Sequence, residues 1–352
     1  MTTLVINPGS TSTKVAVFED AEELDKKTLS HTKDELAQFA TITDQFAFRY
    51  DLIMDFLDEV GIAPEMLDCV VSRGGSPPDA RSGATTINEA LVTALRERPL
   101  EPHPACVGPV IAYRIAQEHD IPSYIYDPIT ADELNHLARV FGVKGIEHDS
   151  MCHVLNTRAM AIAVAKEMGS TLNDKTFIVA HFGGGNSVAC WHKGLLHDVV
   201  PGDAGAFSAE RCGFIRGEKL AQLGQKYDFK TVTGWFHGKG GMVSLLGTND
   251  FRDVETMIVA GDERALLCEQ AMAYQLSRSI ASLFPTVNGK VDGIILTGGG
   301  ANWERLVADI QKRLEYLNVP FHVLPGENEM QSLAEGALRV VNGEEKAHTY
   351  GS

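Results

Sequence analysis

The segment Leu4–Phe18 is the feature that most limits what this chain can fold into. Leu4-Val5-Ile6 is apolar and β-branched, Asn7–Ser10 has turn chemistry, and Val15 and Val17 then alternate with smaller residues. This order predicts a strand, a tight polar turn and a returning strand. Strand and helix patterns alternate from there to about residue 128, so we predict an α/β domain for this part of the chain.

The turn of this hairpin is more polar than a simple reversal requires. Its polar residues are Asn7, Ser10, Thr11, Ser12, Thr13 and Lys14. It is not a Walker loop, because the G-x-x-x-x-G-K pattern is absent and a strand follows in place of a helix. An ordinary hairpin with a polar tip is the alternative, but such a tip needs only about two to five residues. Hydroxyl and amide donors around one lysine favour phosphate binding.

The same pattern recurs later in the chain. Phe177–His181 is predicted to be a strand, Phe182–Ser187 a turn that contains Gly183, Gly184 and Gly185, and Val188–Trp191 the returning strand. A third strand is predicted at Leu195–Val200. The repeat is one of pattern and not of residue identity, and it indicates a duplicated domain.

A third glycine-rich turn follows the predicted strand Val291–Leu296 and precedes a predicted helix from Trp303. It contains Gly298, Gly299 and Gly300. Glycine allows a close backbone approach to a ligand, and a phosphate or ribose can bind near the N-terminus of a helix. One such turn is weak evidence because glycine-rich turns are common. Three of them favour a nucleotide held between two lobes.

Composition excludes several kinds of partner. A net charge of −16 without a run of Lys or Arg argues against nucleic acid or an acidic membrane as the partner. The six cysteines form no C-x-x-C pair, which favours reduced thiols and a cytoplasmic location. No apolar run is long enough to span a membrane, and a strand beginning at Leu4 leaves no room for a signal peptide. The 352 residues suffice for two domains.

The three turns, in this order, resemble the two phosphate motifs and the adenosine motif of the acetate and sugar kinase/actin superfamily. Within it, the chain is similar to the acetokinase family along nearly its whole length. The segments that carry this similarity are Ile6–Lys14, Val70–Gly75, Tyr126–Pro128, His181–Gly185, Phe207–Arg211, Leu296–Gly299 and Leu333–Gly336. The combination is specific, although each segment alone is not.

The resemblance implies an α/β fold of two duplicated actin-like ATPase (ribonuclease H-like) lobes around a nucleotide cleft. The expected N-terminal lobe comprises residues 1–145 and is completed by the C-terminal helix in 331–352. The expected C-terminal lobe comprises residues 146–330 and carries the second phosphate motif and the adenosine motif. The family is generally homo-oligomeric, so a homo-oligomer is expected here as well.

The implied activity is ATP-dependent phosphorylation of a short-chain fatty acid, butyrate or a branched relative, to an acyl phosphate. The reaction is reversible, is expected to serve ATP formation, and uses ATP/ADP and Mg²⁺. A carboxylate is already ionised at pH 7, so the nucleophile needs no general base. The site must instead supply positive charge, alignment and exclusion of water.

The family's catalytic residues map onto five positions of this sequence. By resemblance, Arg73 and Arg211 face the transferring phosphoryl group and the substrate carboxylate, where a guanidinium fork suits both oxyanions. His153 and His181 are expected to donate hydrogen bonds to phosphoryl oxygens. Asp127 is expected to orient Mg²⁺ and an active-site arginine. The alternatives are ordinary ones, namely surface arginines and capping or core histidines.

The resemblance also assigns the nucleotide and the metal. Asn7, Ser10, Ser12 and Lys14 correspond to the first phosphate motif, Gly183–Gly185 to the second, and Gly298–Gly300 to the adenosine motif. Glu329 matches the family's metal-side glutamate, with Asn7 as its partner. Mg²⁺ takes few protein carboxylates and keeps several waters. The alternative for Glu329 is an acidic residue favoured at a helix N-terminus, and His103 is a weaker candidate for the site.

Several positions depart from the family's patterns. Acetate kinases have Arg at the position of Val70, His at Arg73 and Asn at Gly184, which argues against acetate as the preferred substrate. Enzymes of the butyrate type usually have Asn at the position of Cys106, so the role of that loop is open. Cys152 replaces a bulky apolar residue expected near the acyl pocket. A smaller side chain there could admit a longer or branched acid.

Two other functions remain open at this point. The first is an acetate or propionate kinase, which substrate competition would separate. The second is an actin-like ATPase switch that acts on a protein partner. That second function predicts ATP turnover without any carboxylate and little need for Arg73.

Overall fold

The computed structural model describes residues 1–351, which form two compact units. The first comprises Met1–Asp132 together with Asn328–Ser352, and the second comprises Glu133–Glu327. We call these the N-terminal unit and the central unit. Residues 133–145, which the sequence analysis placed in the first lobe, group with the central unit, and residues 328–330 group with the N-terminal unit.

The N-terminal unit contains a seven-stranded sheet in the order β12-β5-β6-β4-β1-β2-β3. Its strands are β1 (Thr2–Pro8), β2 (Ser12–Glu19), β3 (Glu22–Ser30), β4 (Cys69–Arg73), β5 (Ala84–Thr86), β6 (Ser123–Tyr126) and β12 (His348–Thr349). The first three strands form an antiparallel meander, whereas β4 runs parallel to β1 and β6 runs parallel to β4. The carboxyl ends of β1, β4 and β6 therefore meet at one edge of the sheet.

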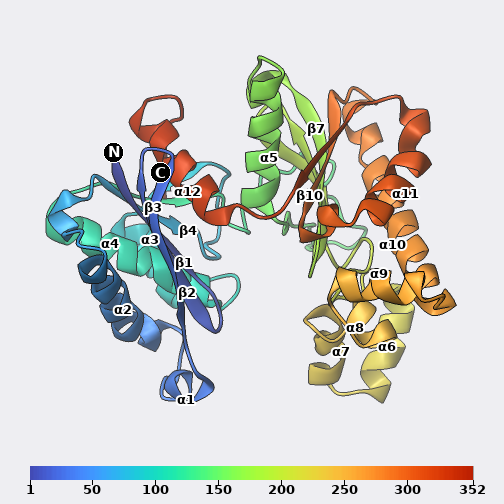
Figure 1. The fold of residues 1–352 in the computed structure, drawn as a ribbon, viewed down its shortest axis with the longest axis horizontal. Coiled ribbons are helices and arrows are strands. Elements are labelled where there is room, and N and C mark those ends of the chain that lie inside the picture. Colours follow the sequence, from blue (N-terminus) through green and yellow to red (C-terminus); the bar gives the residue numbers. More distant parts are fainter. Residues whose placement is uncertain (352) are drawn as a thin grey trace. The chain divides into compact units, whose positions relative to one another are not determined.

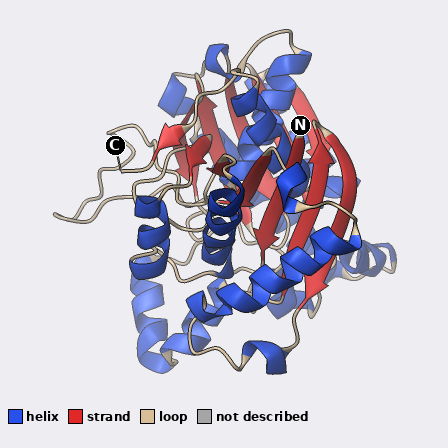
Figure 2. Cartoon of the chain, turned by 90° about the vertical axis from the view of Figure 1, so that its left-hand side faces the viewer, coloured by secondary structure: helices blue, strands red, loops and turns tan. Residues whose placement is uncertain are grey.

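Helices cover both faces of this sheet (Figures 1 and 2). Leu4 and Ile6 of β1 pack in one core with α2 (Phe46–Glu59), α3 (Glu89–Glu97) and α4 (Val107–His119). Side chains alternate between the faces of a strand. Accordingly Gly336 of α12 (Glu329–Val341) packs against the ring of Tyr126 on the opposite face. The short helix α1 (Lys33–Leu36) follows β3.

The central unit repeats this plan with five strands in the order β11-β10-β7-β8-β9. They are β7 (Thr176–Phe182), β8 (Asn186–His192), β9 (Leu195–Val200), β10 (Gly293–Gly298) and β11 (Phe321–Pro325). An antiparallel meander is again followed by two parallel strands on the side of its first strand. The duplication expected from the sequence is thus present in the strand topology.

In the central unit, α5 (Val154–Glu167) lies on one side of β7 and β10, and α10 (Glu263–Ser282) and α11 (Glu304–Leu314) lie on the other (Figure 1). Ile178, Ala180 and Phe182 of β7 enter the core formed with α10 and α11. Four further helices lie between β9 and α10 in the sequence. They are α6 (Gly217–Lys226), α7 (Phe229–Phe236), α8 (Gly241–Leu246) and α9 (Phe251–Val259).

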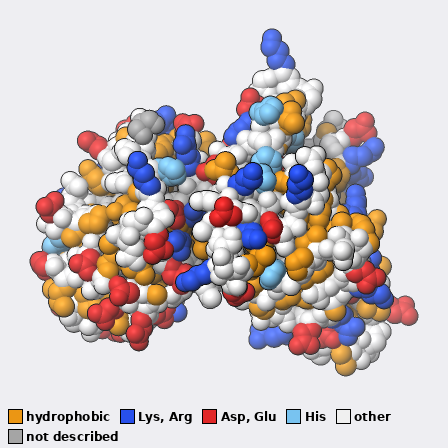
Figure 3. Space-filling model, turned by 90° about the horizontal axis from the view of Figure 1, so that it is seen from above, with side chains coloured by type: hydrophobic (Ala, Val, Ile, Leu, Met, Phe, Trp, Pro, Cys, Tyr) orange, Lys and Arg blue, Asp and Glu red, His pale blue; other side chains and the backbone are white. Residues whose placement is uncertain are grey.

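Charged side chains of both signs lie at the surface (Figure 3), whereas most of the cysteines are buried. Lys and Arg as well as Asp and Glu side chains occur on the face seen in Figure 3, so local basic groups exist on this acidic protein. None of the six cysteines, four of which are buried, forms a disulfide bond with another described residue. Among the described residues, no helix has the length and apolar character that crossing a membrane requires.

Candidate functional site

Three of the expected site residues lie at the carboxyl edge of the N-terminal sheet. Asn7 is near the end of β1, Arg73 is the last residue of β4, and Asp127 directly follows β6. The strand register places Ile6 beside Ser72 and Arg73 beside Tyr126. The carboxyl ends of parallel strands are where open α/β sheets bind ligands.

Glu329 joins this edge from the other end of the chain. One carboxylate oxygen, Oε2, accepts a hydrogen bond of 2.8 Å from Asn7 Nδ2, and the other, Oε1, lies 3.0 Å from Arg73 Nη1. Glu329 is the first residue of α12, which begins two residues earlier than the C-terminal helix expected within 331–352. Asn7, Arg73 and Glu329 therefore form one connected group, and the carboxylate also lies at a helix N-terminus, where a negative charge is favoured.

Asp127 is held in an unusual conformation. Its φ angle is 45°, in the left-handed region that residues other than glycine seldom adopt. Its Oδ1 accepts a hydrogen bond of 2.6 Å from the N–H of Gly83, and the side chain is only 2% exposed. A Cβ at Gly74 would lie 2.6 Å from Cβ of Pro128, so the segment after Asp127 packs closely against the glycine that follows Arg73. The positions of Asp127 and Arg73 are thereby coupled.

The first hairpin turn directs its carbonyl groups toward the protein. Ser12 O accepts from the N–H of Gly9 at 2.7 Å, and Thr11 O accepts from the N–H of His31 at 2.8 Å. The N–H groups of Ser10 and Thr11 make no hydrogen bond to any described residue, and both residues are exposed. Adjacent unbonded N–H groups form the kind of concave donor site that binds anions.

Lys14 belongs to the same side of this hairpin as Asn7. The two residues are paired across β1 and β2, and paired residues of an antiparallel sheet project from the same face. Lys14 is exposed, whereas the neighbouring Thr13 points into the protein. The expected ligands of the first phosphate motif therefore cluster around one turn.

The second hairpin turn has the same organisation. Gly183 O accepts from the N–H of Ala209, and Gly184 O accepts from the N–H of Glu210, both at 3.2 Å. Within residues 1–351 the N–H groups of Gly184 and Gly185 form no hydrogen bond. Most carbonyls of both hairpin turns thus accept hydrogen bonds from the protein, and two consecutive N–H groups of each turn have no partner within residues 1–351.

Arg211 lies directly against this second turn. A Cβ built on Gly185 would come within 2.9 Å of Arg211 Cζ, so the guanidinium covers the glycine. Its backbone is fixed by Ser208, whose Oγ accepts from the N–H of Arg211 at 3.0 Å. In the part of the chain that the structure describes, the Arg211 guanidinium takes part in no hydrogen bond or ion pair. A cation without a protein partner beside a donor-lined turn suits an anionic ligand.

His181, at the end of β7, is held on both ring nitrogens. Nδ1 lies 2.8 Å from Asn156 Oδ1, and Nε2 lies 3.0 Å from Glu327 Oε1. Asn156 Nδ2 donates to Gly326 O at 3.3 Å, which fixes the amide with its oxygen toward the histidine. Both ring nitrogens of His181 therefore face an oxygen atom, which fixes the orientation of the ring.

His153 stacks on His181. The ring centroids are 3.9 Å apart and the planes differ by 12°. His153 is the N-cap residue of α5, and its Nδ1 lies 2.8 Å from Ser187 Oγ on β8. The structure therefore brings the two expected histidines together beside the second turn.

Two of the three glycines in the third turn have a structural reason to be glycine. Gly298 has a φ angle of 88°, and a Cβ there would lie 2.5 Å from Phe182 O. A Cβ on Gly300 would lie 2.7 Å from the Phe182 ring. Only Gly299 faces open space. The turn continues into a 3₁₀ helix, Gly299–Asn302, and α11 begins later, at Glu304.

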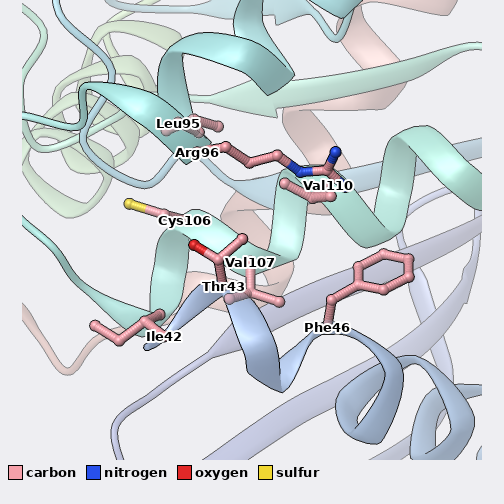
Figure 4. A pocket seen from close by; sticks show the side chains of 8 residues that line it. All are labelled: Ile42, Thr43, Phe46, Leu95, Arg96, Cys106, Val107 and Val110. Carbon is pink, nitrogen blue, oxygen red and sulfur yellow. The ribbon is translucent and has the colours of Figure 1, made fainter. Parts of the chain in front are cut away.

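In the loop that contains His103 and Cys106, both side chains contact other parts of the protein. His103 Nδ1 accepts from the N–H of Ala105 at 3.1 Å, so the ring caps a 3₁₀ turn. Burial, followed by the charge of Arg73, lowers the pKa of His103 below its usual range. Cys106 lines a cavity of about 10 Å³ with the other residues labelled in Figure 4. That volume holds at most about one water molecule, so this cavity does not accommodate a fatty acid.

No cage of protein ligands for a metal exists in the described part of the chain, because no three His, Cys, Asp or Glu residues gather there. Mg²⁺ in kinases is held by one or two protein oxygen ligands together with water and substrate phosphates. The Glu329 carboxylate beside the Asn7 amide supplies oxygen donors of the kind that Mg²⁺ prefers. The residues present therefore fit a magnesium ion that arrives with the nucleotide.

Sequence analysis missed several residues that shape the site. Asn156 and Ser187 orient the two histidines, Glu327 contacts His181, and Ser208 holds the backbone of Arg211. The Glu-Asn-Glu order at 327–329 next to a predicted helix could have drawn attention to Glu327. Asn156 lies within a helix without any local motif, so only the fold reveals its contact with His181.

Comparisons with known proteins give the family of the chain. The acetokinase family model matches residues 115–346. A probable butyrate kinase of Clostridium botulinum (strain Alaska E43 / Type E3) is 40% identical over 99% of both chains, and butyrate kinase 1 of Clostridium acetobutylicum is 39% identical over the same shares.

Solved structures agree on the fold. The acetate kinase of Porphyromonas gingivalis has a TM-score of 0.80 at 18% identity and covers 96% of this chain and 98% of its own. For the propionate kinase of Francisella tularensis the TM-score is 0.76 at 19% identity, with coverage of 95% and 98%. The two-unit α/β architecture is thus the actin-like ATPase fold that these kinases share. On the evidence of its family match and of these full-length relatives, the chain belongs to the acetokinase family.

Proposed function

We propose that this protein transfers the γ-phosphoryl group of ATP to the carboxylate of a short-chain fatty acid, butyrate or a branched relative, and forms an acyl phosphate and ADP. The observation that carries this proposal is the shared organisation of the two hairpin turns, each with two consecutive N–H groups that bond to no described residue. The full-length relatives named butyrate kinase support the choice of substrate.

The chemistry of the site suits a nucleophile that needs no activation. A carboxylate oxygen attacks the γ-phosphorus, the bond from that phosphorus to the bridging oxygen of ADP breaks, and no proton has to be removed. What the protein must supply is positive charge and alignment. We assign Arg73 and Arg211 to the phosphoryl group and the substrate carboxylate. We assign His153 and His181 as donors to phosphoryl oxygens, for which Nε2 of His181 would exchange Glu327 for the phosphate. Asp127 would orient an active-site arginine and the metal.

The nucleotide-binding residues divide between the turns. We assign the ATP phosphates to Asn7, Ser10, Ser12 and Lys14 in the first turn and to Gly183–Gly185 in the second. The adenosine side is assigned to Gly298–Gly300, where Gly299 leaves open space for a ligand. Beyond this turn, Trp303 stacks on Phe251 with centroids 5.3 Å apart, which stabilises the start of α11.

Mg²⁺ would be held by Glu329 and Asn7 together with the phosphates. When bound, it supplies positive charge that offsets the charge of the phosphate oxygens. In the structure described here, Glu329 balances the charge of Arg73 at 3.0 Å and keeps that guanidinium at the edge of the sheet. Glu329 therefore has a positioning role in addition to its proposed role at the metal.

The proposed location, assembly and direction of reaction are those that membership of the family implies. We propose a cytoplasmic homo-oligomer that works reversibly and mainly toward ATP formation, without nucleic acid or membrane partners. Cys152, which is 7% exposed next to His153, is proposed to leave more room for the acyl chain than a bulky residue would.

The decisive experiment traps acyl phosphates with hydroxylamine. The protein is incubated with ATP, Mg²⁺ and straight or branched acids of about two to five carbons, and the hydroxamates are quantified. We expect the largest product with butyrate or isobutyrate and less with acetate. No hydroxamate with any acid would refute the proposal, and ATP hydrolysis that no acid affects would instead favour an ATPase switch.

A further inference from the structure

Arg49 on α2 is a fully buried arginine behind the first hairpin turn. Its Nη2 donates to Gly9 O at 3.0 Å, and its Nη1 donates to Ser12 O at 3.1 Å and to Thr13 Oγ1 at 2.8 Å. Nε and Nη2 both donate to Gln45 Oε1, at 3.0 and 2.9 Å. The five N–H groups of a guanidinium are thus all used, and three of the bonds hold the turn.

The charge of Arg49 has no acidic partner among the described residues. Burial lowers the pKa of Arg49 to about 10, so the group still carries its charge at pH 7. A buried cation that only neutral oxygens surround is costly to the folded state. That cost is offset when an anion binds nearby, because the electrostatic attraction is strong where water is excluded. The N–H groups of Ser10 and Thr11 on the outer side of the same turn are the place for such an anion.

Thr13 links Arg49 to a second buried side chain. Its Oγ1 accepts from Arg49 and lies 2.9 Å from Nε2 of His31. The hydroxyl hydrogen is then free to point at His31, which requires an unprotonated Nε2. Burial, together with the nearby charge of Arg49, lowers the pKa of His31, in agreement with a neutral ring. The backbone N–H of His31 also donates to Thr11 O at 2.8 Å. Each carbonyl from Gly9 to Ser12, apart from that of Ser10, is therefore tied to this network.

We propose that Arg49 is the positioning residue of the first phosphate turn. By binding Gly9 O, Ser12 O and Thr13 Oγ1 from the inside, it keeps the turn's donors directed outward and places a positive charge beneath the phosphates. The inference rests on the proposed function, since it takes a nucleoside triphosphate as the anion. The inference concerns binding of the nucleotide's phosphates and not of its adenosine, because the contacts of Arg49 all lie within the N-terminal unit.

The test compares nucleotide binding by four full-length proteins: wild type, Arg49→Lys, Thr13→Val and Thr3→Val. Thr3→Val is the matched control, because Thr3 is a fully buried residue of the same sheet whose hydroxyl has no hydrogen-bond partner among the described residues. Calorimetry gives the Kd of the ATP analogue AMP-PNP with Mg²⁺ and the Kd of adenosine. Thermal unfolding of each protein shows whether it is folded.

We expect the Kd of AMP-PNP to rise at least about tenfold in Arg49→Lys. In Thr13→Val it should rise about three- to tenfold, which is the effect of losing a single hydrogen bond. The Kd of adenosine should stay within about twofold in both variants, and Thr3→Val should match wild type for both ligands. Equal weakening of AMP-PNP and adenosine, or unchanged AMP-PNP binding in folded Thr13→Val, would overturn the proposal. Should Arg49→Lys fail to fold, Thr13→Val decides.

The outcome separates this inference from the proposed function. Wild-type acyl phosphate formation in the hydroxamate assay tests the enzyme activity without any variant. If wild type forms acyl phosphate while Arg49→Lys and Thr13→Val bind AMP-PNP normally, the positioning role is refuted and the function stands. If wild type forms no acyl phosphate but binds AMP-PNP with the expected dependence on Arg49 and Thr13, the function is refuted and the positioning role stands.

Discussion

Arg73 Nη1 at the end of β4 lies 3.0 Å from Glu329 Oε1 at the start of α12. The second carboxylate oxygen of Glu329 accepts from Asn7 Nδ2. This carboxylate thus connects the last helix to the first and fourth strands at the edge of the sheet where ligands are expected. The ion pair holds the Arg73 guanidinium in place at this edge. In the proposed reaction, alignment of this kind would lower the barrier.

We therefore predict that Arg73→Ala lowers kcat for acyl phosphate formation by about 10²-fold or more, as for other groups that stabilise developing charge. Arg73→Lys should recover only part of the loss, because an ammonium cannot reproduce the two-pronged geometry of the guanidinium. The hydroxamate assay measures both variants, and thermal unfolding serves as the control for folding. An Arg73→Ala protein that forms acyl phosphate at the wild-type rate would refute the role assigned to Arg73 and leave the proposed reaction itself standing.

Local sequence predicted the elements that carry strong periodic or turn signals. The hairpins at Leu4–Phe18 and Phe177–Trp191 were predictable because apolar strands flank turn residues. Their common topology confirms the duplication. By contrast, β3 (Glu22–Ser30) is a polar, exposed strand whose sequence does not alternate, so its strand structure depends on pairing with β2. The helices α7 and α8, with 8 and 6 residues, are too short to show a clear helical period in the sequence.

The site was predictable where a motif marks a residue and unpredictable where the fold creates the contact. Glu329 and Asn7 were paired by resemblance, and they are hydrogen-bonded in the structure. Arg49 gave no signal, because an arginine within an amphipathic helix normally faces solvent, and only the packing of α2 against the hairpin buries it. The role of Asn156 beside His181 depends likewise on the position of α5 next to β7.

A second prediction concerns the glycines of the second turn. A Cβ at Gly185 would lie 2.9 Å from Arg211 Cζ, whereas a Cβ at Gly184 would lie 3.5 Å from the nearest atom, Glu210 Oε2, which is an ordinary contact. Gly185→Ala must therefore displace the Arg211 guanidinium. We expect Gly185→Ala to lower kcat about tenfold or more, and Gly184→Ala to have a clearly smaller effect. Steady-state kinetics measure both, and equal losses in the two variants would show that displacement of Arg211 is not the cause.

A third prediction tests the choice of acid. Cys152 is a small, nearly buried side chain beside His153. Cys152→Phe adds volume there, so longer and branched acids should lose more kcat/KM than acetate, and the ranking should move toward shorter chains. One methylene in an apolar pocket typically changes specificity by about 10- to 200-fold. The experiment compares kcat/KM for acetate, butyrate, isobutyrate and valerate, and an unchanged ranking would refute a role of Cys152 in the acyl pocket.

A fourth prediction concerns Glu269 of α10, which is only 2% exposed. Its carboxyl oxygen Oε1 has no hydrogen-bond partner among the described residues. Burial first, and then the charge of Asp309, raises the pKa of Glu269 to about 7, although Arg305 and Arg313 oppose the shift. These two arginines are engaged elsewhere. Arg305 pairs with Glu255, which also raises the Glu269 pKa slightly, and Arg313 pairs with Asp309. Among residues 1–351, Glu269 therefore forms no ion pair with a cation.

The raised pKa sets the sign of the pH dependence. In the unfolded chain the carboxyl loses its proton near pH 4.5, whereas in the folded protein it keeps the proton up to about pH 7. Between these values the folded state binds more protons, so the free energy of unfolding falls as pH rises from about 4.5 to about 7 and stays low above that. A shift of this size corresponds to a cost on the order of 3 kcal/mol at alkaline pH.

Glu269→Gln removes the charge and keeps the shape, so it should raise Tm relative to wild type at pH 8 and have little effect near pH 4.5. With about 2–4 °C per kcal/mol for a unit of this size, the expected gain is several degrees. Glu263→Gln, at an exposed position of the same helix, is the control and should change the Tm difference little across this range. Thermal unfolding of the three proteins between these pH values measures the effect. A Tm gain of Glu269→Gln that is the same at both pH values would show that ionisation of Glu269 does not destabilise the folded protein.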